Sequence, residues 1–301
     1  MGRIEDGKIR WSGSTIEARF AGSGIAVRLR HDKSIYSYRI DDRVPELLTG
    51  PTLAEHLDAR TEHHLVIVRE SEALAGEDQF LGFDFVPGGE LLPLPEPERR
   101  RPRIEIVGDS ITCGYGILGD GPECHFSLDT ERATKAYGAL AARKLAADLT
   151  TICWSGRGIY RNYDEPDAPT MPELWTPDPK GAPDVVVVAL GTNDVLAPRD
   201  RFDPSRFERA YLAFLARIRA AYPKAPVVLG VSPMLEGVER RLLADSLANI
   251  VAARRSGGDA SVDILVWEEQ GKRLGCDFHP NAAMHEVMAR QLVEALGPKL
   301  R

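Results

Sequence analysis

The chain has 301 residues, 43% hydrophobic and 28% charged, which is enough apolar material for one large domain or two. A formal net charge of −7 argues against nucleic-acid binding as the main function. No apolar stretch approaches the roughly 20 residues that a membrane-spanning helix needs, so we expect no membrane partner.

The N-terminal residues and the cysteines bear on the compartment. Residues 1–7 contain no hydrophobic segment, so no signal peptide is visible. The four cysteines form no CxxC pair and are too few for a disulfide framework. We therefore expect reduced thiols and a cytoplasmic protein, or an extracellular one if a leader was removed.

Residues 1–97 are predicted to form an antiparallel β-sandwich, jelly-roll-like in its run of short strands. Apolar and polar residues alternate over 14–20 and 24–30, as half-buried strands require. The break at 21–24 is predicted to be a hairpin turn. Further strands are expected at residues 34–40, 64–69 and 80–86.

Five prolines between residues 87 and 102 favour an extended linker over helix or central strand. We place the linker itself at residues 98–102 and a second domain at residues 103–301. The residues between 164 and 183 form a long proline-rich loop, and long loops in compact domains are often functional.

From residue 103 onward, β-branched runs alternate with amphipathic stretches. The expected strands are residues 104–107, 150–154, 185–190, 227–231 and 264–267, and the expected helices are residues 134–147, 205–221, 238–255 and 281–296. This alternation predicts an α/β fold, a parallel sheet flanked by helices on both faces in three layers.

A candidate nucleophile, Ser110, follows the first of these strands. The carboxyl end of a strand in an α/β sheet is where substrates bind, although a Gly-Asp-Ser tripeptide alone also suits an ordinary turn. A serine hydroxyl needs an adjacent base. Of the seven histidines, His279 is the best candidate, because Pro280 and Asn281 follow it and open the last helix.

Three further motifs follow Ser110 in a fixed order. They are Trp154-Ser155-Gly156-Arg157-Gly158, Gly191-Thr192-Asn193-Asp194 and Asp277-Phe278-His279-Pro280-Asn281. Ser, Gly, Asn and His in this order resemble the four sequence blocks of the SGNH (GDSL-type) hydrolase superfamily. With a β-sandwich in front, the chain is most similar to carbohydrate esterase family two, acetyl esterases that act on acetylated xylan and related polysaccharides.

The resemblance implies roles for these residues. Ser110 would be the nucleophile and His279 its base. The oxyanion hole would comprise the N–H groups of Ser110 and Gly156 and the side-chain amide of Asn193. Asp109 and Asp194 are expected to be structural, bonding nearby backbone N–H groups.

The third catalytic residue departs from the superfamily pattern. Most SGNH enzymes carry an aspartate three residues before the histidine, and here that position is Cys276. Asp277 lies two residues before His279, and in an extended segment such residues share a side. We expect the Asp277 carboxylate to orient His279; a main-chain carbonyl, such as that of Phe278, is the alternative.

The predicted activity is removal of O-acetyl groups from xylo- or manno-oligosaccharides through an acyl-enzyme, without metal or cofactor. The expected partner is a small-molecule or oligosaccharide ester. An SGNH lipase or thioesterase for longer acyl chains is one alternative, and a carbohydrate-binding protein with a decayed catalytic half is another. Aromatic rings offer flat faces to sugars, and the candidate contacts are Tyr115, Tyr160, Trp175 and Phe278.

Overall fold

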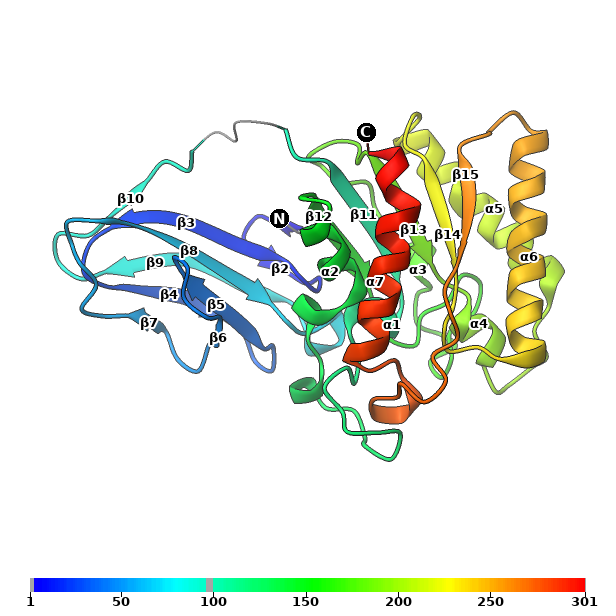
Figure 1. Cartoon of the computed structure of the whole chain (residues 1–301), viewed down its shortest axis with the longest axis horizontal. Coiled ribbons are helices and arrows are strands. Elements are labelled where there is room, and N and C mark those ends of the chain that lie inside the picture. Colours follow the sequence, from blue (N-terminus) through cyan, green and yellow to red (C-terminus); the bar gives the residue numbers. More distant parts are fainter. Residues whose placement is uncertain (1–2, 96–99, 301) are drawn as a thin grey trace.

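The computed structural model describes residues 3–95 and 100–300, which form two parts joined side by side (Figure 1). Residues 3–92, called here the sandwich, contain two antiparallel sheets. Residues 103–300, the α/β part, contain one parallel sheet with helices. The boundary expected between residues 97 and 98 lies outside the described residues.

The sandwich confirms the predicted antiparallel architecture. One sheet has the order β1-β2-β9-β4-β7 and the other the order β10-β3-β8-β5-β6. The rings of Phe20 and Phe85, one from each sheet, lie 6.0 Å apart in the shared core. The strands are β1 Ile4–Glu5, β2 Lys8–Ile9, β3 Thr15–Ala21, β4 Ile25–Arg30, β5 Tyr36–Ile40, β6 Glu46–Leu47, β7 Thr52–Ala54, β8 Glu62–Arg69, β9 Asp78–Phe85 and β10 Glu90–Leu92.

Two local predictions in this half are wrong. The break at residues 21–24 is no hairpin, because β3 pairs with β8 and β4 with β9 in different sheets. Turn-forming residues indicate that the chain reverses direction, but they do not indicate which strands pair with each other. The proline-rich segment, predicted to be an extended linker, also contains the edge strand β10, which pairs with β3.

The α/β part has the predicted parallel sheet, in the order β12-β11-β13-β14-β15. Its strands are β11 Arg103–Gly108, β12 Asp148–Cys153, β13 Val185–Ala189, β14 Val227–Val231 and β15 Val262–Val266. Helices α2 (Tyr137–Lys144) and α7 (Ala282–Leu296) pack on one face. Helices α5 (Pro204–Ala221) and α6 (Gly237–Ser256) pack on the other.

The position of β13 in the sheet explains its run of four valines. Val185 and Val187 face α2 and α7, while Val186 and Val188 face α5 and α6. A strand buried on both faces has no solvent side to mark with polar residues. No helix in the described part of the chain is long and apolar enough to cross a membrane.

The strand order sets the place of the site. The chain runs from β11 to β12 on one side and then crosses to β13 on the other, so β11 lies at the switch point where ligands bind in open α/β sheets. Ser110 follows β11, Gly156 follows β12 and Asn193 follows β13. Three adjacent carboxyl ends therefore carry the three predicted oxyanion residues.

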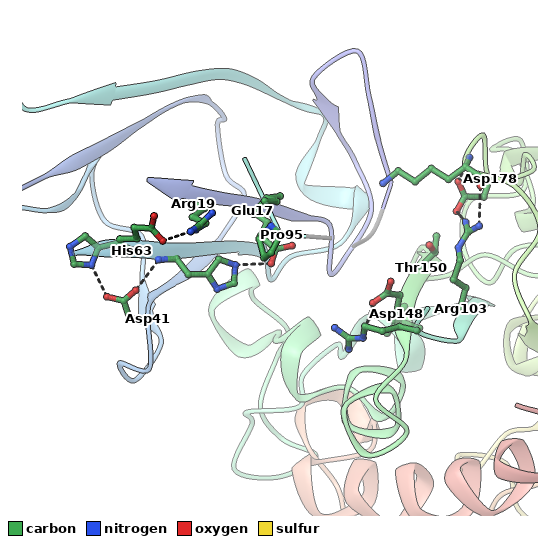
Figure 2. A pocket seen from close by; sticks show the side chains of 15 residues that line it. Glu17, Arg19, Asp41, His63, Pro95, Arg103, Asp148, Thr150 and Asp178 are labelled. Carbon is green, nitrogen blue, oxygen red and sulfur yellow. Dashed lines mark hydrogen bonds and ion pairs between the residues drawn. The ribbon is translucent and has the colours of Figure 1, made fainter. Parts of the chain in front are cut away.

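The sandwich and the α/β part share both apolar and polar surface. Trp11 and Ala73 of the sandwich belong to the same core cluster as Val107 and Ile152. A polar cavity of about 600 Å³ also lies between the two parts (Figure 2). None of the predicted site residues lines this cavity, so the site lies elsewhere.

The prediction of four reduced thiols is wrong. Cys113 is bonded to Cys153, and Cys124 is bonded to Cys276. The first bond joins the end of α1 (Ser110–Cys113) to the end of β12, and the second spans 152 residues. Counting and spacing did not indicate these bonds, because the partners come together only when the sheet edge forms.

Candidate active site

Ser110 and His279, 169 residues apart, meet at the carboxyl edge of the sheet. Ser110 opens α1, whose first turn is capped by Asp109: its Oδ1 accepts the N–H of Ile111 at 3.1 Å. His279 follows a single 3₁₀ turn, Cys276–Phe278, just before α7. His279 Nε2 lies 2.9 Å from Ser110 Oγ, within hydrogen-bond reach for a base and its nucleophile.

The main chain orients the imidazole. His279 Nδ1 lies 3.0 Å from the backbone oxygen of Asp277. A carbonyl only accepts, so Nδ1 carries the hydrogen and Nε2 is left to accept the Ser110 hydroxyl proton. The backbone curls to make this contact: Asp277 and Phe278 have φ of 49° and 62°, a left-handed conformation uncommon outside glycine and often found at functional sites.

The Asp277 carboxylate forms no hydrogen bond with the His279 ring, which corrects the prediction. It accepts hydrogen bonds from Tyr115 Oη at 2.9 Å and from the N–H of Phe126 at 2.8 Å, and it pairs with His125 Nδ1 at 3.0 Å. The prediction assumed an extended segment, and the observed curl sends the side chain the other way. Although burial alone would raise the pKa of Asp277, these three partners lower it below its usual value.

Burial sets the protonation state of the base. It lowers the pKa of His279 to about 4, although the nearby oxygens of Asp277 oppose the shift. The charged form is disfavoured because the ring sits among Ser110, Tyr115 and the curled backbone. The imidazole is therefore neutral near pH 7, which is the form that accepts a proton.

The candidate oxyanion donors come from the three adjacent loops. The N–H of Ser110 lies in the first turn of α1 and has no intrahelical partner. Gly156 has φ of 77°, and within the described ranges its N–H has no protein acceptor. Asn193 Nδ2 donates one hydrogen to the oxygen of Arg157 at 2.9 Å, and an amide nitrogen carries a second.

Asp109 and Asp194 have the structural roles predicted for them. Asp194 is fully buried and accepts the N–H groups of three consecutive residues at 2.8 to 3.3 Å. These residues are Ile159, Tyr160 and Arg161, in the loop that follows the Gly156 turn. Asp109 caps α1 as described above.

The four predicted aromatic contacts separate into two groups. The Tyr115 ring lies beside that of His279, tilted by 31° with the centroids 4.1 Å apart, and Phe278, directly before His279 in the chain, is 57% exposed. Tyr160 instead packs towards α5: its ring lies 6.4 Å from that of Phe207.

The prediction that Trp175 lines the cleft is wrong. The side chain is 1% exposed, and its Nε1–H donates to Glu105 at 2.8 Å. The ring packs edge-on against Phe214 and Tyr222. The long loop contributes this tryptophan to the core, where an aromatic ring buries a large apolar area and its N–H needs an acceptor.

Sequence reasoning missed Glu72. It belongs to the sandwich, yet its carboxylate bonds Ser155, the residue before Gly156. No local signal identifies it, because 83 residues separate the two partners.

Comparisons with known proteins cover nearly all of the chain. Residues 106–287 match the model of the GDSL-like Lipase/Acylhydrolase family, and residues 1–95 match that of the Carbohydrate esterase 2 N-terminal domain. A family two carbohydrate esterase from Clostridium thermocellum, solved in complex with cellohexaose, superimposes with a TM-score of 0.90 at 32% identity. The match covers 99% of this chain and 98% of that one.

Two curated relatives are esterases by name. Cellulase/esterase CelE of Acetivibrio thermocellus is 33% identical over 97% of this chain, which spans only 38% of that protein's length. The acetylxylan esterase / glucomannan deacetylase of Cellvibrio japonicus is 26% identical over 96% of this chain and 85% of its own length. From its two matched models and its shared fold, the chain belongs to the GDSL-like lipase/acylhydrolase family, and within it to the family two carbohydrate esterases.

Proposed function

We propose that the chain is a serine esterase that removes O-acetyl groups from acetylated carbohydrates, xylo- or manno-oligosaccharides among them, through an acyl-enzyme. The observation that carries the proposal is the 2.9 Å contact between Ser110 Oγ and the neutral Nε2 of His279. The names of the esterase relatives supply the substrate class.

In the proposed reaction Ser110 Oγ attacks the acetyl carbonyl carbon while its proton passes to His279 Nε2. The resulting oxyanion accepts hydrogen bonds from the N–H groups of Ser110 and Gly156 and from the amide of Asn193. The imidazolium then protonates the departing sugar oxygen. Water, deprotonated by the same Nε2, attacks the acetyl-serine and releases acetate.

In this site the main-chain carbonyl of Asp277 would take the place of the carboxylate that orients the histidine in a triad. It fixes the tautomer and holds the ring towards Ser110, which is the positioning role of the aspartate in a triad. A carbonyl dipole stabilises the imidazolium less than a full negative charge does. Tyr115 and Phe278, beside the histidine, are the proposed sugar contacts.

The two disulfides bear on the compartment. Disulfides persist in oxidising surroundings and are rare in the cytosol, so we place the working enzyme in an oxidising compartment rather than in the cytoplasm.

The test measures acetate released from a set of positionally acetylated xylo- and manno-oligosaccharides, beside Ser110→Ala. We expect release by the wild type and a loss of roughly 10⁴-fold or more in the variant, since the nucleophile is absent. A parallel series of 4-nitrophenyl esters from acetate to decanoate should favour acetate. A preference for the long chains, with intact acetylated sugars, would refute the proposal in favour of a lipase or thioesterase.

A further inference from the structure

The segment after β8 carries the sandwich into the α/β part. The Arg69 guanidinium is fully buried and donates to the main-chain oxygens of Ile9, Glu72 and Gly76 at 2.6, 2.9 and 2.7 Å. It also pairs with Asp78 at 3.0 Å. One buried cation therefore holds the loop between β8 and β9 in a single shape, and Glu72 projects from that loop.

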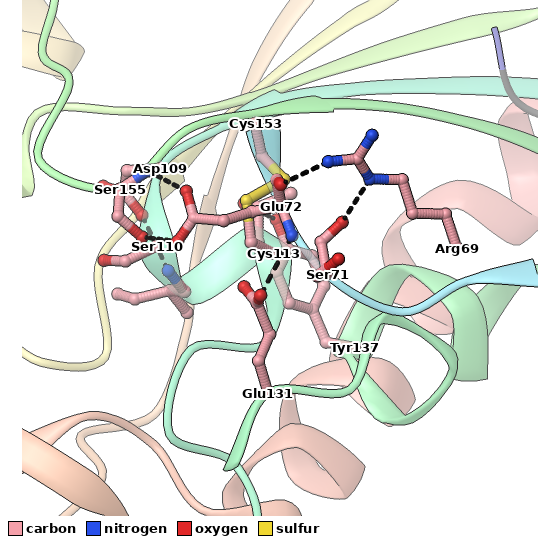
Figure 3. The surroundings of a disulfide bond; sticks show 12 residues. Arg69, Ser71, Glu72, Asp109, Ser110, Cys113, Glu131, Tyr137, Cys153 and Ser155 are labelled. Carbon is pink, nitrogen blue, oxygen red and sulfur yellow. Dashed lines mark hydrogen bonds between the residues drawn. A yellow bond between two sulfur atoms is a disulfide. The ribbon is translucent and has the colours of Figure 1, made fainter. Parts of the chain in front are cut away.

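Both carboxylate oxygens of Glu72 are occupied by Ser155. Oε2 accepts the Ser155 N–H at 2.7 Å, and Oε1 accepts the Ser155 hydroxyl. Glu72 is fully buried. Figure 3 shows it reaching Ser155 beside the Cys113–Cys153 disulfide, with Ser110 nearby. Two donors on two oxygens suit an ionised carboxylate, which only accepts.

A second buried acid supports this charge state. Glu131, in the segment between α1 and α2, accepts the main-chain N–H of Glu72 at 2.9 Å. Burial raises the pKa of both acids. For Glu72 the hydrogen bonds from Ser155 and the charges of Arg157 and Arg69 oppose the rise, whereas the charge of Glu72 adds to the rise for Glu131, whose pKa lies well above its usual value. Of the two acids, Glu131 therefore holds the proton. Glu72 therefore faces a neutral acid and not a second negative charge.

Ser155 directly precedes Gly156, and the N–H of Gly156 belongs to the rigid peptide plane that joins the two residues. Cys153, two residues earlier, is tied to α1 by its disulfide. With its N–H and its hydroxyl fixed by Glu72, Ser155 has little freedom to rotate the plane that follows. Without the carboxylate, two partly buried donors would lose their acceptor and the turn would relax.

We propose that Glu72 of the sandwich is a positioning residue of the oxyanion hole: it holds the Ser155 turn so that the N–H of Gly156 points at the oxyanion formed on Ser110. The inference rests on the proposed function in taking Gly156 as an oxyanion donor. It gives the sandwich a part in catalysis, since the carboxylate that aligns the donor comes from the other half of the chain.

The test uses the full chain and three substitutions, Glu72→Ala, Glu72→Gln and Glu70→Ala. Glu70 is the matched control, because its carboxylate accepts the N–H and hydroxyl of Thr134 at 2.9 and 2.8 Å across the same junction. Thr134 adjoins no candidate oxyanion donor. Steady-state kinetics with 4-nitrophenyl acetate and thermal midpoints are measured for each.

For Glu72→Ala we expect kcat to fall about 100-fold, the typical effect of a catalytic donor misplaced by about 1 Å, with KM changed less than about threefold. Glu72→Gln keeps one acceptor oxygen for the Ser155 N–H and offers an N–H to its hydroxyl. The kcat of Glu72→Gln should therefore be at least tenfold higher than that of Glu72→Ala, which is roughly the effect of one hydrogen bond. Glu70→Ala should lower the thermal midpoint and leave kcat within about twofold, because it leaves the donors in place.

A folded Glu72→Ala variant with wild-type kcat would overturn the inference, as would an equal loss of kcat in Glu70→Ala. If Glu72→Ala does not fold, Ser155→Ala decides: it removes one of the two donors and should lower kcat roughly three- to tenfold, whereas unchanged kcat overturns the inference. The assay substrate, 4-nitrophenyl acetate, carries no sugar. A wild-type enzyme that cleaves it but does not cleave acetylated oligosaccharides therefore refutes only the proposed carbohydrate substrate. An inert wild type overturns both.

Discussion

The Asp277 carboxylate should contribute little to catalysis, because His279 is oriented by the main-chain oxygen of residue 277, which any amino acid supplies. Asp277→Asn keeps an acceptor oxygen for Tyr115 and Phe126, and asparagine tolerates the left-handed backbone at this position. The variant loses the negative charge of residue 277, and in the wild type that charge favours the imidazolium through space. For two partly solvated charges that interact through space without a hydrogen bond, this contributes about 1 kcal/mol, or roughly fivefold in kcat.

A Ser-His-Asp triad predicts something different. There the same substitution removes the partner of the histidine and lowers kcat by about 10⁴. The assay is kcat and KM on 4-nitrophenyl acetate and on an acetylated xylo-oligosaccharide, with His279→Ala as the reference for loss of the base. His279→Ala should lose roughly 10² to 10⁴ in rate. A loss above about 10³ in Asp277→Asn would refute the carbonyl-oriented histidine.

Other predictions follow from burial and bonding. Since only the neutral imidazole of His279 accepts a proton, kcat/KM should fall about tenfold per pH unit below the pKa of about 4; an acid limb centred near the ordinary histidine pKa of about 6.5 would contradict the burial. Trp175→Ala should lower the free energy of unfolding in urea by about 3–5 kcal/mol and leave kcat of the folded enzyme nearly unchanged, because it empties a core site and strips Glu105 of a donor. In denaturant, thiol titration should find no free thiol before reduction and four after it, and thiols that titrate without reductant would count against the pairing. Reduction should also lower the thermal midpoint, because both disulfides close loops in the unfolded chain, and the loop closed by Cys124–Cys276 is the longer of the two.

The sequence alone was sufficient for the layers of the fold. Uninterrupted valines in β13 and alternating residues in β3 report whether one or both faces of a strand are buried, and this is a local property of the chain. Ser110, Gly156 and Asn193 were identified by ordered motifs that resemble the SGNH blocks. Each lies shortly after such a strand, and parallel strands bring their carboxyl ends to one edge. The division of the chain at residues 97 and 103 stays a prediction.

Tertiary structure alone decided which distant groups touch. The curl at residues 277 and 278 replaced a carboxylate by a carbonyl at His279, and it depends on contacts from Tyr115 and Phe126, more than 150 residues away. The burial of Trp175 and the link between Glu72 and Ser155 were likewise absent from any local pattern. Periodicity encodes which side of an element is buried, whereas the partner of a single side chain depends on how the elements pack, and that is settled only when the two halves of the chain meet.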